Sequence, residues 1–320
     1  MFGKISLKSL TITFFILLLV VMGINYLDHK RGDRSFQSQL AQIDQNDITS
    51  VSITTPGADK ELSIYKKGEE WRVSNSSEDF LADPDMVSGI IRVFEDLRAE
   101  RVASYKKESW EKFEVTDSAA IRVRVNSGEK ELADVLIGKF SYAMPHKPQM
   151  AMQNSYMQGK VTSYVRLTGK REVFAVNGFL KGTFNRNFND LRSKTVLKGN
   201  RSDWTKIMVT HPADSSFTLQ KDGVHWMMNG AEADSASLVS FLNSLTSVNG
   251  RSFADEKPTG QPIHQMLIEG TGMETPVKIE AYGDVENPVV VSSLNPESYF
   301  DANEGDLFNK LFGKRPKRKE

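Results

Sequence analysis

Apolar and polar residues alternate along two stretches of the chain, and this alternation predicts two sets of antiparallel strands. A period of two places apolar side chains on one face of a sheet and polar ones on the other. In the first set, Gly68 marks a turn and Trp71 lies in the strand that follows it. In the second set, residues 204–228, Gly223 and Trp226 stand at the same interval. The two tryptophans are therefore expected to fill equivalent core positions.

Each set of strands is followed by a segment with the period of an amphipathic helix. Asp83 is placed to cap the first helix, Pro84 stands at its first position, and Asp234 takes the place of Asp83 in the second. Because two periods, a cap and a tryptophan recur in one order, we interpret the pattern as an internal duplication. It predicts the α+β class, with two tandem modules that each consist of an antiparallel sheet backed by one long helix. The apolar positions of the helices are Val87, Ile90, Ile91, Phe94 and Leu97, and Leu238, Phe241, Leu242, Leu245 and Val248.

The amino-terminal segment has no polar face. Residues 10–26 form an apolar run near the shortest length that spans a bilayer, which predicts a transmembrane helix before the two modules. No convincing pair of small residues marks a cleavage site, so the helix is expected to remain as an anchor. The short start with Lys4 and Lys8 favours a cytoplasmic amino terminus. The expected organisation is a membrane anchor over residues 1–35, a first module over 36–197, a second module over 198–309 and a basic tail over 310–320.

Several segments carry a resemblance to a known family. They are "WEKFEVTDSAAIRVRV", "LIGKFS", "SYVRLTGKREVFAVNGFL" and "FNRNFNDLRSKTVL", which follow the glycine turn, the tryptophan and the capped helix. In this order they resemble the bacterial family of the domain of unknown function 4340, from about residue 36 to 256. The resemblance implies a membrane-anchored protein associated with ABC-type export or gliding-motility permeases. It supplies no catalytic residue.

Composition narrows the classes of function. Lys and Arg together number 41, as do Asp and Glu, so no net field attracts nucleic acid. The chain has no cysteine, which excludes disulfides and thiolate metal sites. Its five histidines are scattered, without the spacing of a metal site, and no phosphate-binding loop or nucleophile elbow is present. We therefore expect a protein that is not an enzyme, holds no cofactor or metal and binds no nucleic acid.

Residues 141–160 are rich in methionine and admit two interpretations. Their thioether and imidazole groups are soft ligands that would suit copper(I). They would equally suit a long hairpin tip at which flexible methionines contact a partner, and we favour this second interpretation. The residues concerned are Met144, His146, Met150, Met152 and Met157.

The middle of the chain contains the candidate partner contacts, Tyr164, Arg166, Arg186, Phe188 and Arg192. Aromatic and arginine side chains are enriched in binding hot spots. The same mixture of amides, aromatics and arginines would also suit a rigid connector between the two modules, so both interpretations stay open.

The expected function is a membrane-anchored, extracytoplasmic accessory protein of an ABC-type transport or gliding-motility complex. Residues 10–26 would contact membrane lipid, and a permease would be the protein partner. From the bacterial cytoplasmic (inner) membrane, the large domain would face the periplasm or the cell exterior. The alternative is an extracytoplasmic ligand-binding or envelope-structural module that works without a transporter.

Overall fold

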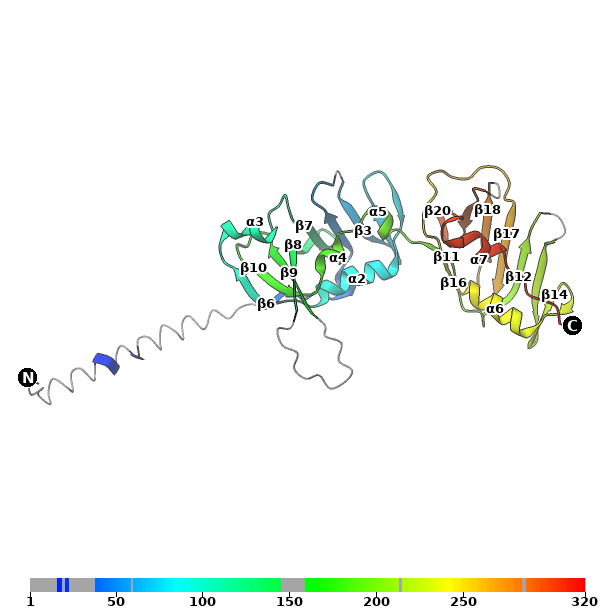
Figure 1. The fold of residues 1–320 in the computed structure, drawn as a ribbon, viewed down its shortest axis with the longest axis horizontal. Coiled ribbons are helices and arrows are strands. Elements are labelled where there is room, and N and C mark those ends of the chain that lie inside the picture. The colour runs from blue at the N-terminus through cyan, green and yellow to red at the C-terminus, as the bar shows by residue number, and fades with distance from the viewer. Residues whose placement is uncertain are drawn as a thin grey trace, which may run out of the picture.

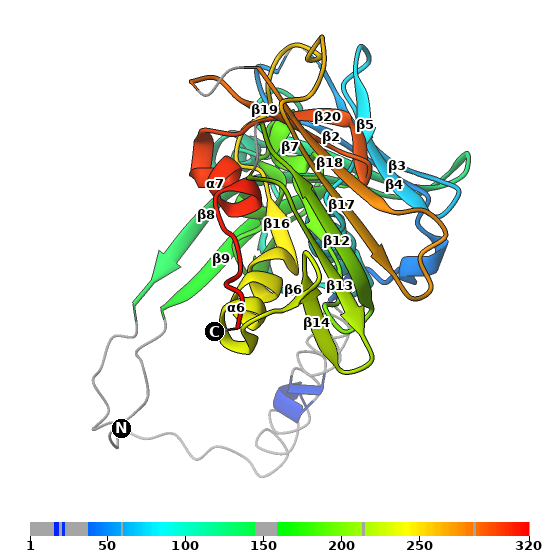
Figure 2. The same cartoon turned by 90° about the vertical axis from the view of Figure 1, so that its right-hand side faces the viewer.

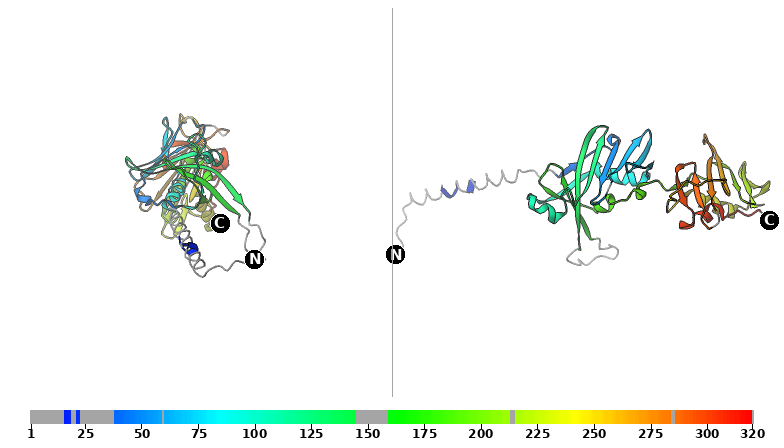
Figure 3. Two further views of the ribbon diagram at one scale, coloured as in Figure 1. Left: turned by 90° about the vertical axis from the view of Figure 1, so that its left-hand side faces the viewer. Right: turned by 90° about the horizontal axis from the view of Figure 1, so that it is seen from above.

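Antiparallel strands make up most of the protein. The computed structural model describes residues 16–18, 21–22, 38–58, 60–144, 159–212, 215–283 and 286–319. Within them the strands form a ten-stranded, an eight-stranded and a two-stranded sheet. Two bodies, each of sheet and short helices, follow one another along the long axis of the molecule (Figures 1 and 3).

The ten-stranded sheet is formed by strands from the first part of the chain, and all its pairings are antiparallel. Alternation holds as the sequence indicates, since Val51 and Ile53 are buried and the residues beside them are half-exposed. In sheet order the strands are β1 (Gln39–Ala41), β6 (Leu97–Ser104), β10 (Val173–Asn177), β9 (Lys160–Leu167), β8 (Lys130–Ala143), β7 (Ile121–Ser127), β2 (Ser50–Thr54), β3 (Leu62–Lys67), β4 (Glu70–Ser74) and β5 (Asp79–Leu81).

The other two sheets belong to the second body. The two-stranded sheet pairs β11 (Thr195–Lys198) with β16 (Ser247–Asn249). The eight-stranded sheet consists, in sheet order, of β15 (Ala231–Glu232), β14 (His225–Met228), β13 (Phe217–Asp222), β12 (Trp204–Thr210), β17 (His264–Gly270), β18 (Val277–Tyr282), β19 (Val289–Ser292) and β20 (Asn295–Asp301).

The α+β class with one long helix behind each sheet is wrong, because the helices of the described residues are few and short. α2 (Pro84–Glu95) has 12 residues and α6 (Ser235–Leu245) has 11. The last apolar positions predicted for these helices, Leu97 and Val248, lie instead in β6 and β16. Both are buried, so the apolar period continues past the helix end into a strand, and periodicity alone cannot mark the boundary. The remaining helical elements are η1 (Gln45–Asp47), η2 (Lys107–Ser109), α3 (Trp110–Phe113), α4 (Leu180–Phe184), α5 (Phe188–Leu191), η4 (Glu304–Asp306) and α7 (Leu307–Phe312).

The transmembrane helix predicted over residues 10–26 has no counterpart among the residues that the structure describes. Among the residues that the structure describes, no helix is long and apolar enough to cross a membrane. Of the predicted span, residues 10–26, only 16–18 and 21–22 are described, and these are helical. The rest of that prediction lies outside the described residues.

The duplication is visible in local geometry. Gly68 and Gly223 have φ values of 64° and 58°, in the tight turns that join β3 to β4 and β13 to β14. The Asp83 carboxylate accepts hydrogen bonds from backbone N–H groups in the first turn of α2. Asp234 caps α6 in the same way, through the N–H of Ser237. The turn and the cap therefore recur in both modules.

Each module has its own apolar core. The first core ends along the chain at Leu191 and the second begins at Val196. Trp204 is fully buried in the second core. Trp71 and Trp226 are only partly buried, and each packs against the core of its own module. The two equivalent tryptophans thus close the edges of the cores.

Candidate interaction surfaces

Strands β8 and β9 extend beyond the rest of their sheet. β7 pairs with β8 only as far as Ile137, and β10 pairs with β9 only as far as Thr162, whereas β8 and β9 pair with each other as far as Ala143 and Lys160. The outer part of this hairpin therefore projects as a two-stranded arm (Figure 2). In the sequence the methionine-rich segment follows β8, and residues 145–158 lie outside the described part. The copper hypothesis falls almost wholly on those residues.

The arm carries large apolar side chains that are exposed. Phe140, Tyr142 and Met144 alternate along β8 and its extension, with exposed fractions of 46%, 54% and 68%. Phe179, which is 49% exposed, packs edge-on against Phe140 with ring centroids 4.5 Å apart. Gly159 fits beneath the Tyr142 ring, where a Cβ atom would lie 2.1 Å from the ring. We name Phe140, Tyr142, Met144 and Phe179 the hairpin surface.

Tyr164 lies on β9 beside the arm and is half-buried. Its hydroxyl lies 3.3 Å from Ser141 Oγ, and its ring lies 4.5 Å from that of Phe113, centroid to centroid. Of the five predicted partner contacts, Tyr164 is therefore the one that lies beside the arm, where it contacts Ser141.

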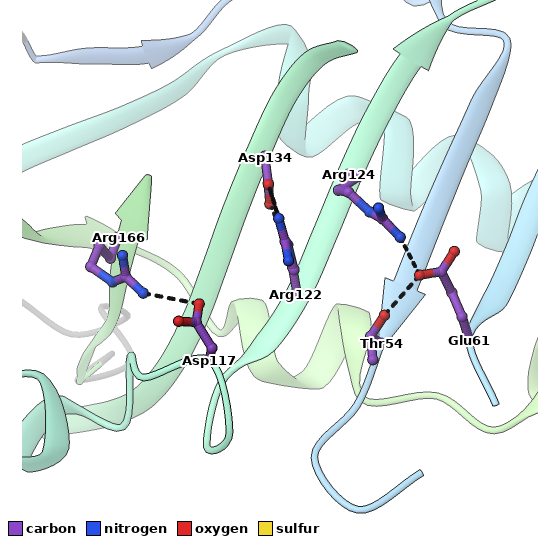
Figure 4. Close-up of polar contacts among 7 residues, drawn as sticks. All are labelled: Thr54, Glu61, Asp117, Arg122, Arg124, Asp134 and Arg166. Carbon is purple, nitrogen blue, oxygen red and sulfur yellow. Dashed lines mark hydrogen bonds and ion pairs between the residues drawn. The ribbon is translucent and has the colours of Figure 1, made fainter. Parts of the chain in front are cut away.

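Arg166 has a structural role. It is only 3% exposed. Its Nη2 pairs with Asp117 at 3.3 Å (Figure 4). Its Nε donates to the Val115 carbonyl at 2.9 Å, and its guanidinium carbon lies 3.8 Å from the centroid of Trp110. These contacts tie the α3 segment onto the sheet, so Arg166 is not available to a partner.

Two further arginines follow on the same face of the sheet (Figure 4). Arg122 donates through Nε at 3.0 Å and Nη2 at 2.5 Å to the Asp134 carboxylate, and this bonding raises the pKa of Arg122. Arg124 pairs with Glu61, which also accepts from Thr54 at 3.1 Å. Partial burial acts to raise the pKa of Glu61, but its hydrogen bonds outweigh that effect and leave this pKa below its usual value. Each carboxylate is thus paired with an arginine, which suits a structural role better than proton transfer.

Arg192 lies between the two modules. It is 7% exposed, and its guanidinium carbon lies 3.6 Å from the centroid of Phe80 in β5 and 3.7 Å from that of Phe253. Its Nη2 donates to Ser298 Oγ of β20 at 3.3 Å, and its Nη1 donates to Asn189 Oδ1 at 3.1 Å. Burial lowers the pKa of this guanidinium below its usual value. The geometry of Arg192 is that of the connector, not of a free contact residue.

An ion pair also crosses this junction. Arg72 of β4 donates to Asp79 at 3.0 Å and to Glu297 of β20 at 2.7 Å. Burial acts to lower the pKa of Arg72, but these two carboxylates raise it well above its usual value. Nothing in the sequence pairs Arg72 with Glu297.

Arg186 and Phe188 lie in the segment that leads to the junction, and both are half-buried. Arg186 Nε makes one long hydrogen bond, 3.4 Å, to the Thr183 carbonyl. Phe188 packs against Phe80 with ring centroids 6.0 Å apart. Both line a groove of about 410 Å³ that reaches Leu62. The five predicted residues therefore fall at three separate places: the arm, the outer sheet face and the junction.

The sequence analysis missed most of the residues that form these surfaces. Phe140 and Tyr142 stand two positions apart in "GKFSYAMP", where an alternating strand pattern runs past the end of its core. That continuation is the signal that could have identified the arm. Phe80 and Phe253 carried no such signal, because only the docking of the modules brings them together.

One histidine pair stands out among the remaining polar groups. His211 and His264 face each other from adjacent strand ends of the second module, with their Nδ1 atoms 2.8 Å apart. Burial lowers the pKa of both, and Arg315 lowers that of His211 further. Among the described residues, no group of three or more potential ligands could hold a metal ion.

Comparison with known proteins identifies one family. Residues 71–262 match the family described as domain of unknown function (DUF4340), which spans more than half of the chain and confirms the resemblance seen in the sequence. No curated protein and no solved structure shows a significant match.

Proposed function

The chain belongs to the DUF4340 family, and on this premise we propose that it is a non-enzymatic accessory protein that acts by protein–protein contact. The complex that it serves is an ABC-type transport or gliding-motility assembly, as the family resemblance implies. In this proposal residues 10–26 contact membrane lipid, the two modules lie on the extracytoplasmic side, and a permease is the partner.

The hairpin surface is the observation that supports this proposal most directly. Single exposed apolar residues are common on monomers, but a contiguous apolar cluster on a projecting element is typical of a binding site. Here Phe140, Tyr142, Met144 and Phe179 are each 46% to 68% exposed. The arm that carries them is held by the β8–β9 ladder, so little chain entropy is lost when a partner covers it.

The experiment is co-purification from detergent extract with a doubly substituted chain, Phe140→Ser with Tyr142→Ser. Aromatic anchors at an interface are worth about 2 kcal/mol or more together, which is a loss of roughly 30-fold in affinity. The double variant should lose the permease while its melting temperature stays close to that of the wild type, because both side chains lie outside the core.

Tyr105→Ser is the matched control. Tyr105 is 60% exposed and follows Ser104 of β6, which pairs with Val173 at the end of β10 away from the arm. It should keep the permease. If the double variant co-purifies the permease as the wild type does, the hairpin surface is not the contact. If the wild type recovers no permease, the alternative of an envelope-structural module takes the place of the proposal.

A further inference from the structure

The connector between the modules is hydrogen-bonded to the entry of α2. The backbone N–H of Asp83 donates to the Leu191 carbonyl at 2.8 Å, and the N–H of Ser193 donates to the Leu81 carbonyl at 2.7 Å. Arg192, the residue between these two bonds, points into the junction. From here the chain continues into β11 of the second module.

The C-terminal segment occupies the equivalent place on the second module. The N–H of Asp234 donates to the Lys317 carbonyl at 3.0 Å, and the N–H of Lys319 donates to the Glu232 carbonyl at 2.9 Å. Arg318 lies between these bonds as Arg192 lies between the others, and each forms an isolated bridge with the alanine before the cap. The duplication therefore extends to a third element, and Arg318 is the counterpart of Arg192.

The two counterparts differ in what lies over them. Arg192 is covered by Phe253 and β20 of the second module. The second module contacts the first at its edge strand β5, which is the docking edge of the first module. Arg318 is exposed. The edge of the second module that corresponds to this docking edge, formed by β14, β15 and residues 317–319, lies at the end of the molecule away from the first module (Figure 1).

A cavity of about 290 Å³ opens beside this edge, lined by Trp226, Leu238 and Leu242. Val224 and Val239 also line it and are 88% and 43% exposed. The corresponding cavity of the first module is smaller, about 190 Å³, and is lined by Trp71, Val87 and Ile91. The cavity of the second module is large enough for one apolar side chain and is bordered by exposed apolar surface.

Cationic groups surround the second cavity. Arg201 and Lys221 line it, and neither makes an ion pair with any residue that the structure describes. Its one carboxylate, Glu232, is already held by Lys319 at 2.9 Å and by His225 at 3.2 Å. The edge therefore presents unpaired positive charge around an apolar cavity.

We propose that this terminal edge, formed by β14, β15, residues 317–319 and the Trp226 cavity, binds an acidic protein segment. One apolar side chain of that segment enters the cavity, and flanking carboxylates pair with Arg201, Lys221 and Arg318. The proposal goes beyond the function proposed above, because the terminal edge lies on the second module and the hairpin surface on the first. It would make the protein a bridge between two partners.

The test pans a phage-displayed library of random peptides against the purified full chain. The enriched peptides should combine an aromatic or leucine side chain with neighbouring Asp or Glu. Their affinity, measured by fluorescence polarisation, should weaken as salt is raised. It should fall at least tenfold in Arg201→Glu with Lys221→Glu and in Val224→Glu, whose side chains are exposed and leave the core intact.

Lys66→Glu is the matched control. Lys66 lies opposite Trp71 in the β3–β4 pair, as Lys221 lies opposite Trp226 in the β13–β14 pair. It should leave peptide affinity unchanged. The proposal is overturned if no acidic peptide is enriched or if the double variant binds as well as the wild type. It is also overturned if vesicles of phosphatidylcholine and phosphatidylglycerol bind with the same variant sensitivity while the peptides do not, since lipid would then be the ligand.

Discussion

Replacing Arg192 with alanine would show how the two modules are joined. The guanidinium is enclosed by Phe80 and Phe253 at 3.6 and 3.7 Å, and it also donates to Ser298. A desolvated cation–π contact contributes about 1–2 kcal/mol, and a side-chain hydrogen bond contributes about 1 kcal/mol. The desolvation that lowers the pKa of Arg192 offsets part of this gain. The net loss on substitution should be about 2–4 kcal/mol.

This loss should fall on the docking of the modules, since each module keeps its own core. Calorimetry of Arg192→Ala should show the melting of the two modules move apart. Limited proteolysis should cut near residues 192–195, and spin labels on β5 and β20 should report a broader distance distribution. A double-mutant cycle with Phe253→Ala should be non-additive by about 1 kcal/mol or more, because the two side chains share one contact.

Arg186→Ala is the control for Arg192→Ala. Arg186 lies in the same segment but makes only one 3.4 Å hydrogen bond, so its removal should leave melting and proteolysis nearly unchanged. The reasoning is refuted if Arg192→Ala leaves the melting of both modules unchanged and instead abolishes binding of the partner. Arg192 would then be a contact residue, as the other interpretation of the sequence holds.

Two further predictions concern the duplicated elements and the histidine pair. Asp83→Ala and Asp234→Ala should each lower the free energy of unfolding by about 1 kcal/mol, as measured by urea denaturation, because each removes a helix cap; unequal losses would count against equivalent caps. Burial depresses the pKa values of His211 and His264 below 6.5, so their contribution to stability is present above pH 6.5 and is lost as the pH falls below it. The urea midpoint of the second module should therefore fall as the pH is lowered from 7 to 5. A fall of the same size in His264→Phe as in the wild type would contradict this.

The recurrence of the turn and the helix cap could be predicted from the sequence, because each depends on local signals. A turn at Gly68 needs a positive φ, and a helix start needs a cap such as Asp83. Each requirement therefore selects a residue type that can be recognised within a few positions of the sequence. The alternation of the strands is equally local. The lengths of the helices could not be predicted, because Leu97 and Val248 continue the apolar period inside strands.

The roles of the arginines depend on distant parts of the chain. Arg166 stands at a polar position of an alternating strand pattern, between Val165 and Leu167, and Arg192 stands in the polar segment "FNDLRSK". Both patterns are typical of an exposed arginine. Arg166 is buried because the α3 segment folds over the sheet, and Arg192 is buried because Phe80 and Phe253 meet across the junction. Arg186 lies in a similar sequence context but stays half-buried. Composition and spacing cannot separate these three cases.

The two modules use one structural device for two purposes. In each, a segment with a central arginine is hydrogen-bonded to the entry of the capped helix, at Asp83 in the first module and at Asp234 in the second. Around Arg192 the guanidinium is desolvated between two rings, and the contact fixes one module on the next. Around Arg318 the same backbone geometry leaves the guanidinium in water. An exposed charge is screened by water and salt, and its Coulomb attraction to a carboxylate increases when a partner excludes that water. The difference in burial between Arg192 and Arg318 is therefore what separates a joint from a docking surface in this protein.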